Sequence, residues 1–360
     1  MKVIEVRNVA AALPAGLSYL LSEGVLQDSR AGRVVVAPQP VTTVYSKPCE
    51  RVLFSTVRDA NPYFHLLESC WMLAGRDDAT FLDPYVKDFS SRFAEEGGIQ
   101  AGAYGHRWRH EFGFDQLDAI VDRLRVEPTS RQCVLQMWDA RSMPVHGIGA
   151  DDLLGKWRDR PCNTHVYFRM RRGELDMLVS CRSNDIIMGA YGANAVHFSF
   201  LQEYLAGRLG VPVGLYWQLS WDYHAYVADI ERLARRAKMT TGNVLGSTDQ
   251  AVWGQLLAST LEDQRYARLN PYPIVTAPDA FDADLDRLMH YLDWLHADSS
   301  YATEQLNVKN TFLTQTVSQA AMAHQCYKEK LYDAALALAQ NIEAEDWRVA
   351  CVEWLKRRKK

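Results

Sequence analysis

The sequence predicts a mixed α/β core followed by a helical C-terminal extension. Along the first 275 residues, segments rich in the β-branched and aromatic residues that favour strands alternate with segments whose apolar residues recur at helical spacing. From residue 281 to residue 357 the apolar spacing is helical throughout. We therefore divide the chain of 360 residues into an α/β core, 1–275, and a helical extension, 276–360.

The N-terminal half alternates helical and extended segments. Apolar residues at helical spacing predict helices over residues 9–25, 62–74 and 113–126. A region rich in Val and Thr predicts one or two strands within residues 33–57. The apolar run CVLQMWD predicts a further strand over residues 133–139.

The strongest strand signal lies in the middle of the chain. The segment HVYFRMRRGELDMLVSCRS contains two strands joined around Arg172-Gly173, a dipeptide suited to a hairpin turn. An apolar helix is expected at 194–209, and VGLYWQLSWDYHAY predicts another strand after it. The remaining helices are expected at 226–238, at 248–265 and, three or four in number, within 281–357.

Composition excludes several classes of protein. Hydrophobic residues make up 48% and charged residues 23%, which is the ordinary globular balance, and the net charge of -4 argues against a basic nucleic-acid coat. The seven cysteines are widely spaced and form no C-x-x-C pair, so we expect a reducing cytoplasm and no metal. No window is long and apolar enough for a membrane span.

The motifs of several large enzyme classes are missing. The sequence has no G-x-x-x-x-G-K-[ST] loop, no G-x-G-x-x-G and no G-x-S-x-G. What stands out is RPCNTHVYF at 160–168, then SCRSND at 180–185, then Asn194 and WDYHAY at 221–226. A cysteine before a strand can act as a nucleophile, and an Arg-Ser pair can bind phosphate through a forked donor set and a hydroxyl.

In this order the motifs resemble those of the thymidylate synthase family, which includes the phage-type hydroxymethylases of the pyrimidine nucleotides dUMP and dCMP. Upstream, ESCWMLAGRDD (68–78), AYGHRWRH (103–110) and TSRQCVLQMWD (129–139) are also similar to segments of that family. The resemblance covers about residues 20–275. It implies a large, mixed, bent sheet flanked by helices, a catalytic domain over 1–275, and an obligate homodimer whose sheets pack back to back.

The resemblance implies a covalent mechanism at a pyrimidine ring. Cys162 adds as thiolate to C6, and C5 then attacks the one-carbon unit of methylenetetrahydrofolate. Glu68 handles protons through ordered water, and Tyr104 assists beside the ring. Asn194 reads the base: its amide can accept from N3–H and donate to O4, which favours uracil over cytosine.

The remaining roles concern binding. Because Gln132 stands where the family usually has a second arginine, the phosphate clamp across the dimer interface is expected to be weaker. The implied assignments are Arg182 and Ser183 to the 5′-phosphate, Arg131 to the phosphate across the dimer, Arg30 to a mobile N-terminal phosphate contact, His224 and Tyr226 to the sugar 3′-hydroxyl, and Asp185 and Trp71 to folate.

Departures from an ordinary synthase bear on the final step. Asn163 replaces a histidine, Cys181 replaces a glutamine, and Ser90, or Phe89 with a one-residue slip, replaces a tryptophan that covers the folate side. The short apolar closing tail of the synthases is replaced by tens of helical residues ending in KRRKK. A more open, wetter pocket favours water over hydride as the group that reaches the exocyclic methylene.

We therefore predict a transferase of nucleotide biosynthesis for modified phage-type DNA. Its reaction converts dUMP, methylenetetrahydrofolate and water into 5-hydroxymethyl-dUMP and tetrahydrofolate. The alternatives are a thymidylate synthase that releases dihydrofolate, a dCMP or CMP hydroxymethylase or methylase, and a non-catalytic nucleotide-binding relative. The expected partners are the nucleotide, folate and a second copy of the chain, with neither membrane nor nucleic acid.

Overall fold

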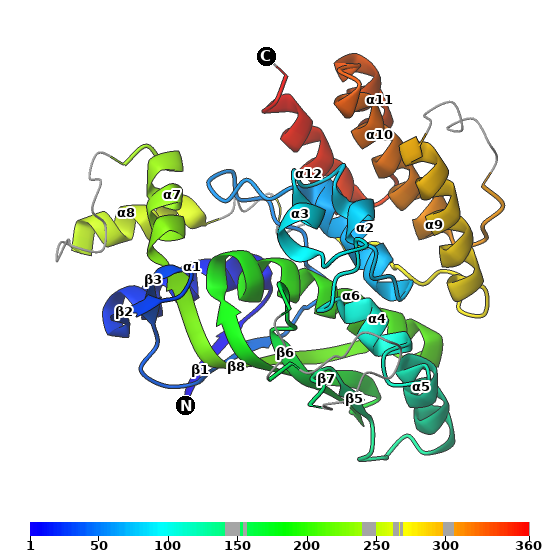
Figure 1. Ribbon diagram of the computed structural model, residues 1–360, viewed down its shortest axis with the longest axis horizontal. Helices are drawn as coiled ribbons and strands as arrows, with labels where there is room; N and C mark the ends of the chain where they lie inside the picture. Colours follow the sequence, from blue (N-terminus) through cyan, green and yellow to red (C-terminus); the bar gives the residue numbers. More distant parts are fainter. Residues whose placement is uncertain are drawn as a thin grey trace.

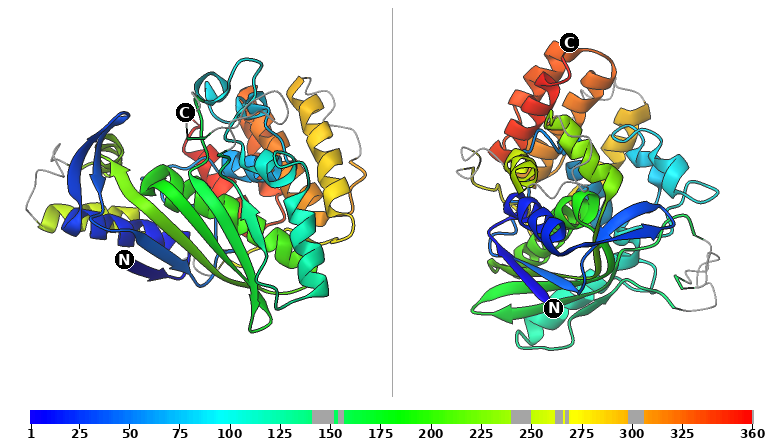
Figure 2. Two further views of the ribbon diagram at one scale, coloured as in Figure 1. Left: turned by 60° about the horizontal axis from the view of Figure 1, so that its bottom comes forward. Right: turned by 90° about the vertical axis from the view of Figure 1, so that its left-hand side faces the viewer.

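A mixed sheet forms the base of the molecule, and most of its helices gather on one face (Figure 1). The structure is a computed structural model that describes residues 1–140, 152–153, 157–239, 250–261, 266, 269–297 and 306–359. With the sheet turned forward, the long central strands lie in front of the helices (Figure 2). The predicted mixed sheet flanked by helices is confirmed.

The sheet has eight strands in the described residues, and its two longest strands run side by side. Its order is β1-β4-β8-β7-β6-β5, with the β2–β3 hairpin joined to β8 through β3. The β7–β8 and β1–β4 pairs are parallel, and the other pairs are antiparallel. The strands are β1 Lys2–Val6, β2 Val25–Ser29, β3 Gly32–Val36, β4 Val41–Tyr45, β5 Val134–Gln136, β6 Asn163–Arg171, β7 Glu174–Asp185 and β8 Val213–Tyr226.

The helices predicted from apolar spacing are present in the described residues, with ends shifted by a few residues; both ends of the helix predicted over 248–265 lie outside the described residues. The shorter helical segments are the 3₁₀ turn Ala79–Leu82 and the π-helical segments Ile186–Ala193 and Leu313–Val317. The α-helices are α1 Val9–Glu23, α2 Pro62–Leu73, α3 Phe89–Phe93, α4 Tyr104–Arg109, α5 Gln116–Val126, α6 Asn194–Leu209, α7 Val227–Arg236, α8 Gln250–Thr260, α9 Phe281–Ala297, α10 Ser318–Lys328, α11 Tyr332–Gln340 and α12 Glu345–Lys356.

The predicted hairpin between β6 and β7 is confirmed at the turn itself. Arg172 and Gly173 have φ values of 54° and 76°, so both adopt the left-handed conformation that a two-residue hairpin turn requires. Strands β1 and β2 were not expected. Every residue of β2 is exposed, and β1 pairs with the distant β4, so neither strand has a strong local signal.

Helix α6 begins at Asn194 and ends before Gly210, whose φ of 70° terminates it. Before it lies the π-helical segment Ile186–Ala193, which is kinked at Tyr191 and Gly192 and whose N-terminus is capped by Asp185. Asn194 is held at the start of a long helix, twelve of whose sixteen residues are buried.

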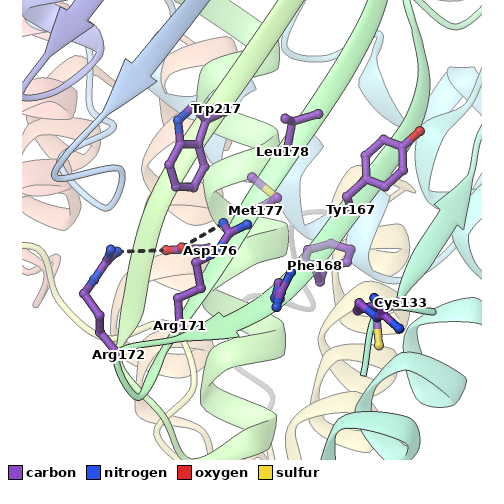
Figure 3. Close-up of a pocket in the computed structure, with 11 residues that line it drawn as sticks. Cys133, Tyr167, Phe168, Arg171, Arg172, Asp176, Met177, Leu178 and Trp217 are labelled. Carbon is purple, nitrogen blue, oxygen red and sulfur yellow. Dashed lines mark hydrogen bonds and ion pairs between the residues drawn. The ribbon is translucent and has the colours of Figure 1, made fainter. Parts of the chain in front are cut away.

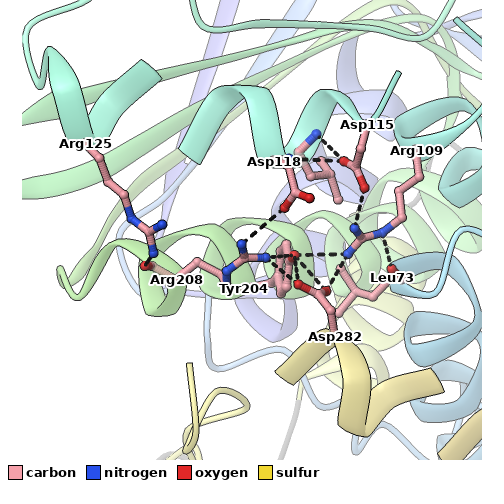
Figure 4. Close-up of polar contacts among 9 residues, drawn as sticks. Leu73, Arg109, Asp115, Asp118, Arg125, Tyr204, Arg208 and Asp282 are labelled. Carbon is pink, nitrogen blue, oxygen red and sulfur yellow. Dashed lines mark hydrogen bonds and ion pairs between the residues drawn. The ribbon is translucent and has the colours of Figure 1, made fainter. Parts of the chain in front are cut away.

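The C-terminal helices pack directly on α2. The ring of Tyr63 on α2 lies 5.1 Å from that of His324 on α10 and 5.5 Å from that of Trp354 on α12. Helix α9 is tied to the core through Asp282, which lies 2.8 Å from Arg109 and also pairs with Arg208 (Figure 4). The extension thus supports the helix that carries Glu68.

Within these described ranges, no helix has the length and apolarity needed to cross a membrane. The same part of the chain contains no cluster of three or more His, Cys, Asp and Glu side chains suited to a metal ion.

Candidate active site

The parallel pairing of β7 with β8 brings the predicted substrate-binding residues to one edge of the sheet. Ser183 is paired with Asp222, and Asp185 with His224, so both strands end at the same place. Cys162 precedes β6, the antiparallel neighbour of β7. The C-terminal end of β7 therefore lies between the cysteine and the histidine.

Cys162 is held next to Arg182. The backbone N–H of Arg182 donates to the carbonyl oxygen of Cys162 at 2.9 Å, and Nε of Arg182 donates to the carbonyl of Pro161 at 3.1 Å. The guanidinium also lies over the ring of Trp138, 5.2 Å from its centroid. Burial raises the pKa of the Cys162 thiol, and the charge of Arg182 partly offsets that increase.

Tyr104 and Asn194 form a hydrogen-bonded chain beside the thiol. The hydroxyl of Tyr104 donates to Oδ1 of Asn194 at 3.3 Å. Nδ2 of Asn194 donates to Asn184 at 3.0 Å, and Asn184 donates to the hydroxyl of Ser220 at 2.9 Å. Burial raises the pKa of Tyr104 well above its ordinary value, so Tyr104 remains a neutral donor.

Glu68 faces a histidine that the motifs did not single out. Its Oε2 lies 3.0 Å from Nε2 of His197, and the two side chains are 12% and 3% exposed. The ring of His65, one turn before Glu68 on α2, lies 6.0 Å from that of His197. Because His197 is three residues after Asn194, both side chains lie on the same face of α6.

His224 is paired with a carboxylate. Its Nδ1 lies 3.0 Å from Oδ1 of Asp222, and its ring meets that of Tyr226 edge-on at 5.4 Å. Burial lowers the pKa of His224, but the hydrogen bond and charge of Asp222 outweigh burial and raise it overall. An imidazole held this way can donate through Nε2 to a ligand hydroxyl.

Asp185 caps the π-helical segment, and Trp71 is a core residue. Oδ1 of Asp185 accepts from the backbone N–H of Ile187 at 3.1 Å, and Oδ2 accepts from Met188 at 2.9 Å. Trp71 is 1% exposed, and its indole N–H donates to Asp78 at 3.2 Å. Asp185 lies in the electrostatic field of His224, whereas Trp71 has little surface to offer a ligand.

Of the two remaining predicted phosphate ligands, Arg30 lies within electrostatic reach of this cluster and Arg131 lies outside it. Arg30 is exposed at the turn between β2 and β3, and its charge acts on Tyr226. Arg131 is exposed and lines the same depression as Tyr167 and Trp217. Those two aromatic residues lie on the sheet face opposite the helices (Figure 3). Within one copy of the chain, the structure brings together Arg182, Ser183, His224 and Tyr226 but not Arg131.

The residues that depart from the synthase pattern are mostly buried. The hydroxyl of Ser90 donates to Asp83 at 2.6 Å, and the ring of Phe89 packs 5.9 Å from that of Phe64 on α2. Asn163 is fully buried, and neither Oδ1 nor Nδ2 of its side-chain amide makes a hydrogen bond with a described residue. Burial raises the pKa of Cys181 well above its ordinary value, which makes it a poor nucleophile.

The fold and this cluster define a protein of the thymidylate synthase class. The family model described as thymidylate synthase matches residues 16–245, well over half of the chain, and the chain belongs to that family. The chain is 40% identical over 365 residues to a deoxyuridylate hydroxymethyltransferase of Pseudomonas phage M6, with 100% of this chain and 95% of the relative covered.

Two further relatives match shorter stretches. A deoxyuridylate hydroxymethyltransferase of Bacillus phage SP01 is 34% identical over 223 residues, which is 59% of this chain and 56% of the relative. A thymidylate synthase of Francisella philomiragia is 25% identical over 170 residues, which is 46% of this chain and 62% of the relative. The match to the M6 protein includes the C-terminal helices in full.

Proposed function

We propose that the protein is a dUMP 5-hydroxymethylase: it joins a one-carbon unit to C5 of dUMP, joins the oxygen of water to that carbon, and releases tetrahydrofolate. Methylenetetrahydrofolate supplies the one-carbon unit at the oxidation level of formaldehyde. The observation that carries the proposal is the 40% identity, over the whole chain, to a phage deoxyuridylate hydroxymethyltransferase. The same identity favours a role in making modified nucleotides for phage-type DNA.

Residues at the neighbouring ends of β7 and β8 would bind the two ends of the nucleotide's sugar phosphate. Arg182 and Ser183 hold the 5′-phosphate, and His224 and Tyr226 hold the sugar hydroxyl at the neighbouring strand end. This fixes the pyrimidine C6 in front of the Cys162 thiol, which attacks as thiolate. Arg182 serves twice, because the cation that binds phosphate also lowers the pKa of the thiol.

Base recognition and proton transfer come from α6 and α2. Asn194 has an amide that can pair with uracil, and Tyr104 orients it through the 3.3 Å hydrogen bond. Glu68 accepts the C5 proton after C5 has bonded to the one-carbon unit. With that proton removed, the bond from the one-carbon unit to the folate nitrogen breaks, tetrahydrofolate leaves with the bonding pair, and an exocyclic methylene remains on C5. Water then adds its oxygen to the methylene carbon and gives up one proton through the Glu68 site, and the electron pair received by the ring re-forms the C5–C6 double bond as Cys162 leaves C6 as thiolate. The proton taken from C5 and the proton given up by water balance the two that tetrahydrofolate takes up on its nitrogens.

The residues present fit a folate co-substrate. Oε2 of Glu68 and Nε2 of His197 are buried and make no hydrogen bond of good geometry with a described residue, so both retain capacity for a ligand or a water. Each oxygen of Asp185 accepts one backbone N–H and keeps a second lone pair for a folate N–H. No residue of this set requires a metal.

We further propose a homodimer formed by the open face of the sheet. That face carries a depression of about 580 Å³ that is lined by Tyr167, Trp217 and a row of arginines (Figure 3). Tyr167 is 44% exposed and Trp221, farther along β8, is 73% exposed, so a second copy would cover large aromatic surface. Arg131 on this face would reach the partner's phosphate site.

The seven cysteines are all free, which fits a reducing compartment such as the cytoplasm.

The test is a product analysis in H₂¹⁸O with dUMP and methylenetetrahydrofolate. The proposal predicts a nucleotide that is heavier than dUMP by one hydroxymethyl group and carries ¹⁸O, because the new oxygen comes from water. The variant C162S should bind dUMP and yield no product. If the protein is non-catalytic, neither the wild type nor C162S will give a product. If it is a thymidylate synthase, the wild type will give thymidylate that carries no ¹⁸O.

A further inference from the structure

Glu68 and His197 form a buried pair in which one polar atom of each side chain makes no hydrogen bond with a described residue. Their Oε2 and Nε2 atoms approach to 3.0 Å, yet neither makes a hydrogen bond of good geometry with any described residue. A buried polar atom without a hydrogen bond costs about 1–3 kcal/mol. A ligand or a water that hydrogen-bonds to these two atoms would remove that cost. The pair lies one helical turn from Asn194, the proposed base-reading residue.

The pair links α2, which carries Glu68, to α6, which carries His197 and Asn194. Helix α2 packs on α6 (Figure 1), and the first turn of α6 presents Asn194 and, one turn later, His197. Asn163 stands next to the nucleophile, where related synthases place a histidine. The imidazole that contacts the proton-handling carboxylate comes from α6.

We propose that His197 is the positioning residue of Glu68: it holds the carboxylate in place for proton transfer. This inference rests on the proposed function, because it assigns a role within that reaction. An imidazole whose Nε2 lies 3.0 Å from a carboxylate oxygen is close enough to fix where that oxygen sits. Holding Glu68 in place affects the chemical step more than nucleotide binding.

Other charged groups face this pair. From α2, His65 lies beside His197, and burial lowers the pKa of His65 well below its ordinary value, so it is neutral. Arg58 acts on His65 from the loop before α2. Asp159, whose pKa is raised by burial, interacts with Glu68 from the segment before Cys162. His197 is thus the imidazole in direct reach of the Glu68 carboxylate.

The test compares H197Q and H197N with the wild type. A Gln amide nitrogen reaches about as far as Nε2, whereas an Asn amide is too short, so kcat should fall about tenfold in H197Q and about a hundredfold in H197N. The KM for dUMP should stay within about threefold of wild type. The profile of kcat against pH should differ from that of the wild type in both variants, and H197Q combined with E68Q should lower kcat no more than E68Q alone.

A matched control separates chemistry from packing. His324 is also 3% exposed, but it lies in the C-terminal helices. H324Q should therefore keep the wild-type kcat and pH profile. Unchanged kcat and pH profile in folded H197Q, or additive losses in the double variant, would overturn the inference.

A second measurement leaves His197 in place. In ¹⁵N-histidine NMR spectra at one pH, the ring nitrogen signals of His197 should differ between the wild type and E68Q, because the carboxylate holds Nε2. Identical signals would contradict the inference.

A trapping experiment with 5-fluoro-dUMP tests the proposed function independently of the role of His197. Its C5 carries no proton to remove once the one-carbon bond has formed, so the covalent adduct on Cys162 should accumulate. Wild type and H197Q should both form this adduct with methylenetetrahydrofolate, as seen by mass spectrometry. A wild-type protein that forms no adduct would contradict the proposed function itself.

Discussion

The backbone N–H of Arg182 donates to the carbonyl oxygen of Cys162 at 2.9 Å, which ties a cation to a buried thiol. Burial alone raises the pKa of that thiol and keeps it protonated. The positive charge of Arg182 acts against burial. Since the same guanidinium is the proposed phosphate ligand, the nucleotide and the nucleophile are positioned by one side chain.

Replacing Arg182 should make Cys162 less reactive. In R182Q the offsetting charge is gone, so the pKa of the Cys162 thiol rises further. The pH profile of Cys162 alkylation by iodoacetamide, followed by peptide mass spectrometry, should therefore move to higher pH. R235Q removes an arginine that is 68% exposed and should leave the alkylation profile unchanged. An unshifted profile in R182Q would refute the electrostatic role.

Removing the carboxylate of Asp222 should weaken the fold at low pH more than at high pH. The pKa of His224 is raised in the folded protein, so the pair stabilises below the ordinary histidine value and that contribution is lost as pH rises through the raised pKa. Because Asp222 is half exposed, D222N should lower the free energy of unfolding by about 0.5–1 kcal/mol at pH 6 and by less at pH 9. Urea denaturation measures both values, and an equal loss at the two pH values would contradict this pairing.

Changing Asn194 should change the choice of base. In N194D the donor for uracil O4 is replaced by an acceptor, which suits the amino group of cytosine. The value of kcat/KM for dUMP should fall about a hundredfold or more, and the ratio of dCMP to dUMP turnover should rise. N341D, at an exposed residue after α11, should leave that ratio unchanged. A uniform loss for both nucleotides would mean that Asn194 acts only through Tyr104.

Mixing two inactive variants should restore activity if the phosphate site is shared between subunits. C162S lacks the nucleophile and R131Q lacks the arginine on the open sheet face. A mixed dimer then contains one site with both native residues, so random exchange should restore about a quarter of wild-type activity. Rates from equal mixtures after subunit exchange measure this. No recovery, with dimers verified by light scattering, would place Arg131 outside the partner's site.

Local signals account for the elements that the sequence predicted well. The hairpin turn at Arg172-Gly173 and the end of α6 at Gly210 depend on left-handed backbone at those residues, which is visible in composition. By contrast, β1 pairs Lys2 with Val41, and no local pattern specifies a partner that far along the chain. Short strands of this kind are fixed by tertiary pairing.

In the candidate site too, the sequence predicted what depends on local motifs and missed what depends on tertiary packing. Ordered motifs identified Cys162, Arg182 and His224, and the parallel pairing of β7 with β8 explains why those motifs meet. The contact between Glu68 and His197 was not predicted, because it depends on how α2 packs on α6. Its one sequence signal is the spacing of three residues from Asn194 to His197.

The central claim is tested most directly by mass spectrometry of the products formed from dUMP and methylenetetrahydrofolate, with dCMP and CMP assayed in parallel. The account predicts 5-hydroxymethyl-dUMP together with tetrahydrofolate, and little turnover of either cytosine nucleotide. Thymidylate together with dihydrofolate would contradict it, because hydride rather than water would then have reached the exocyclic methylene.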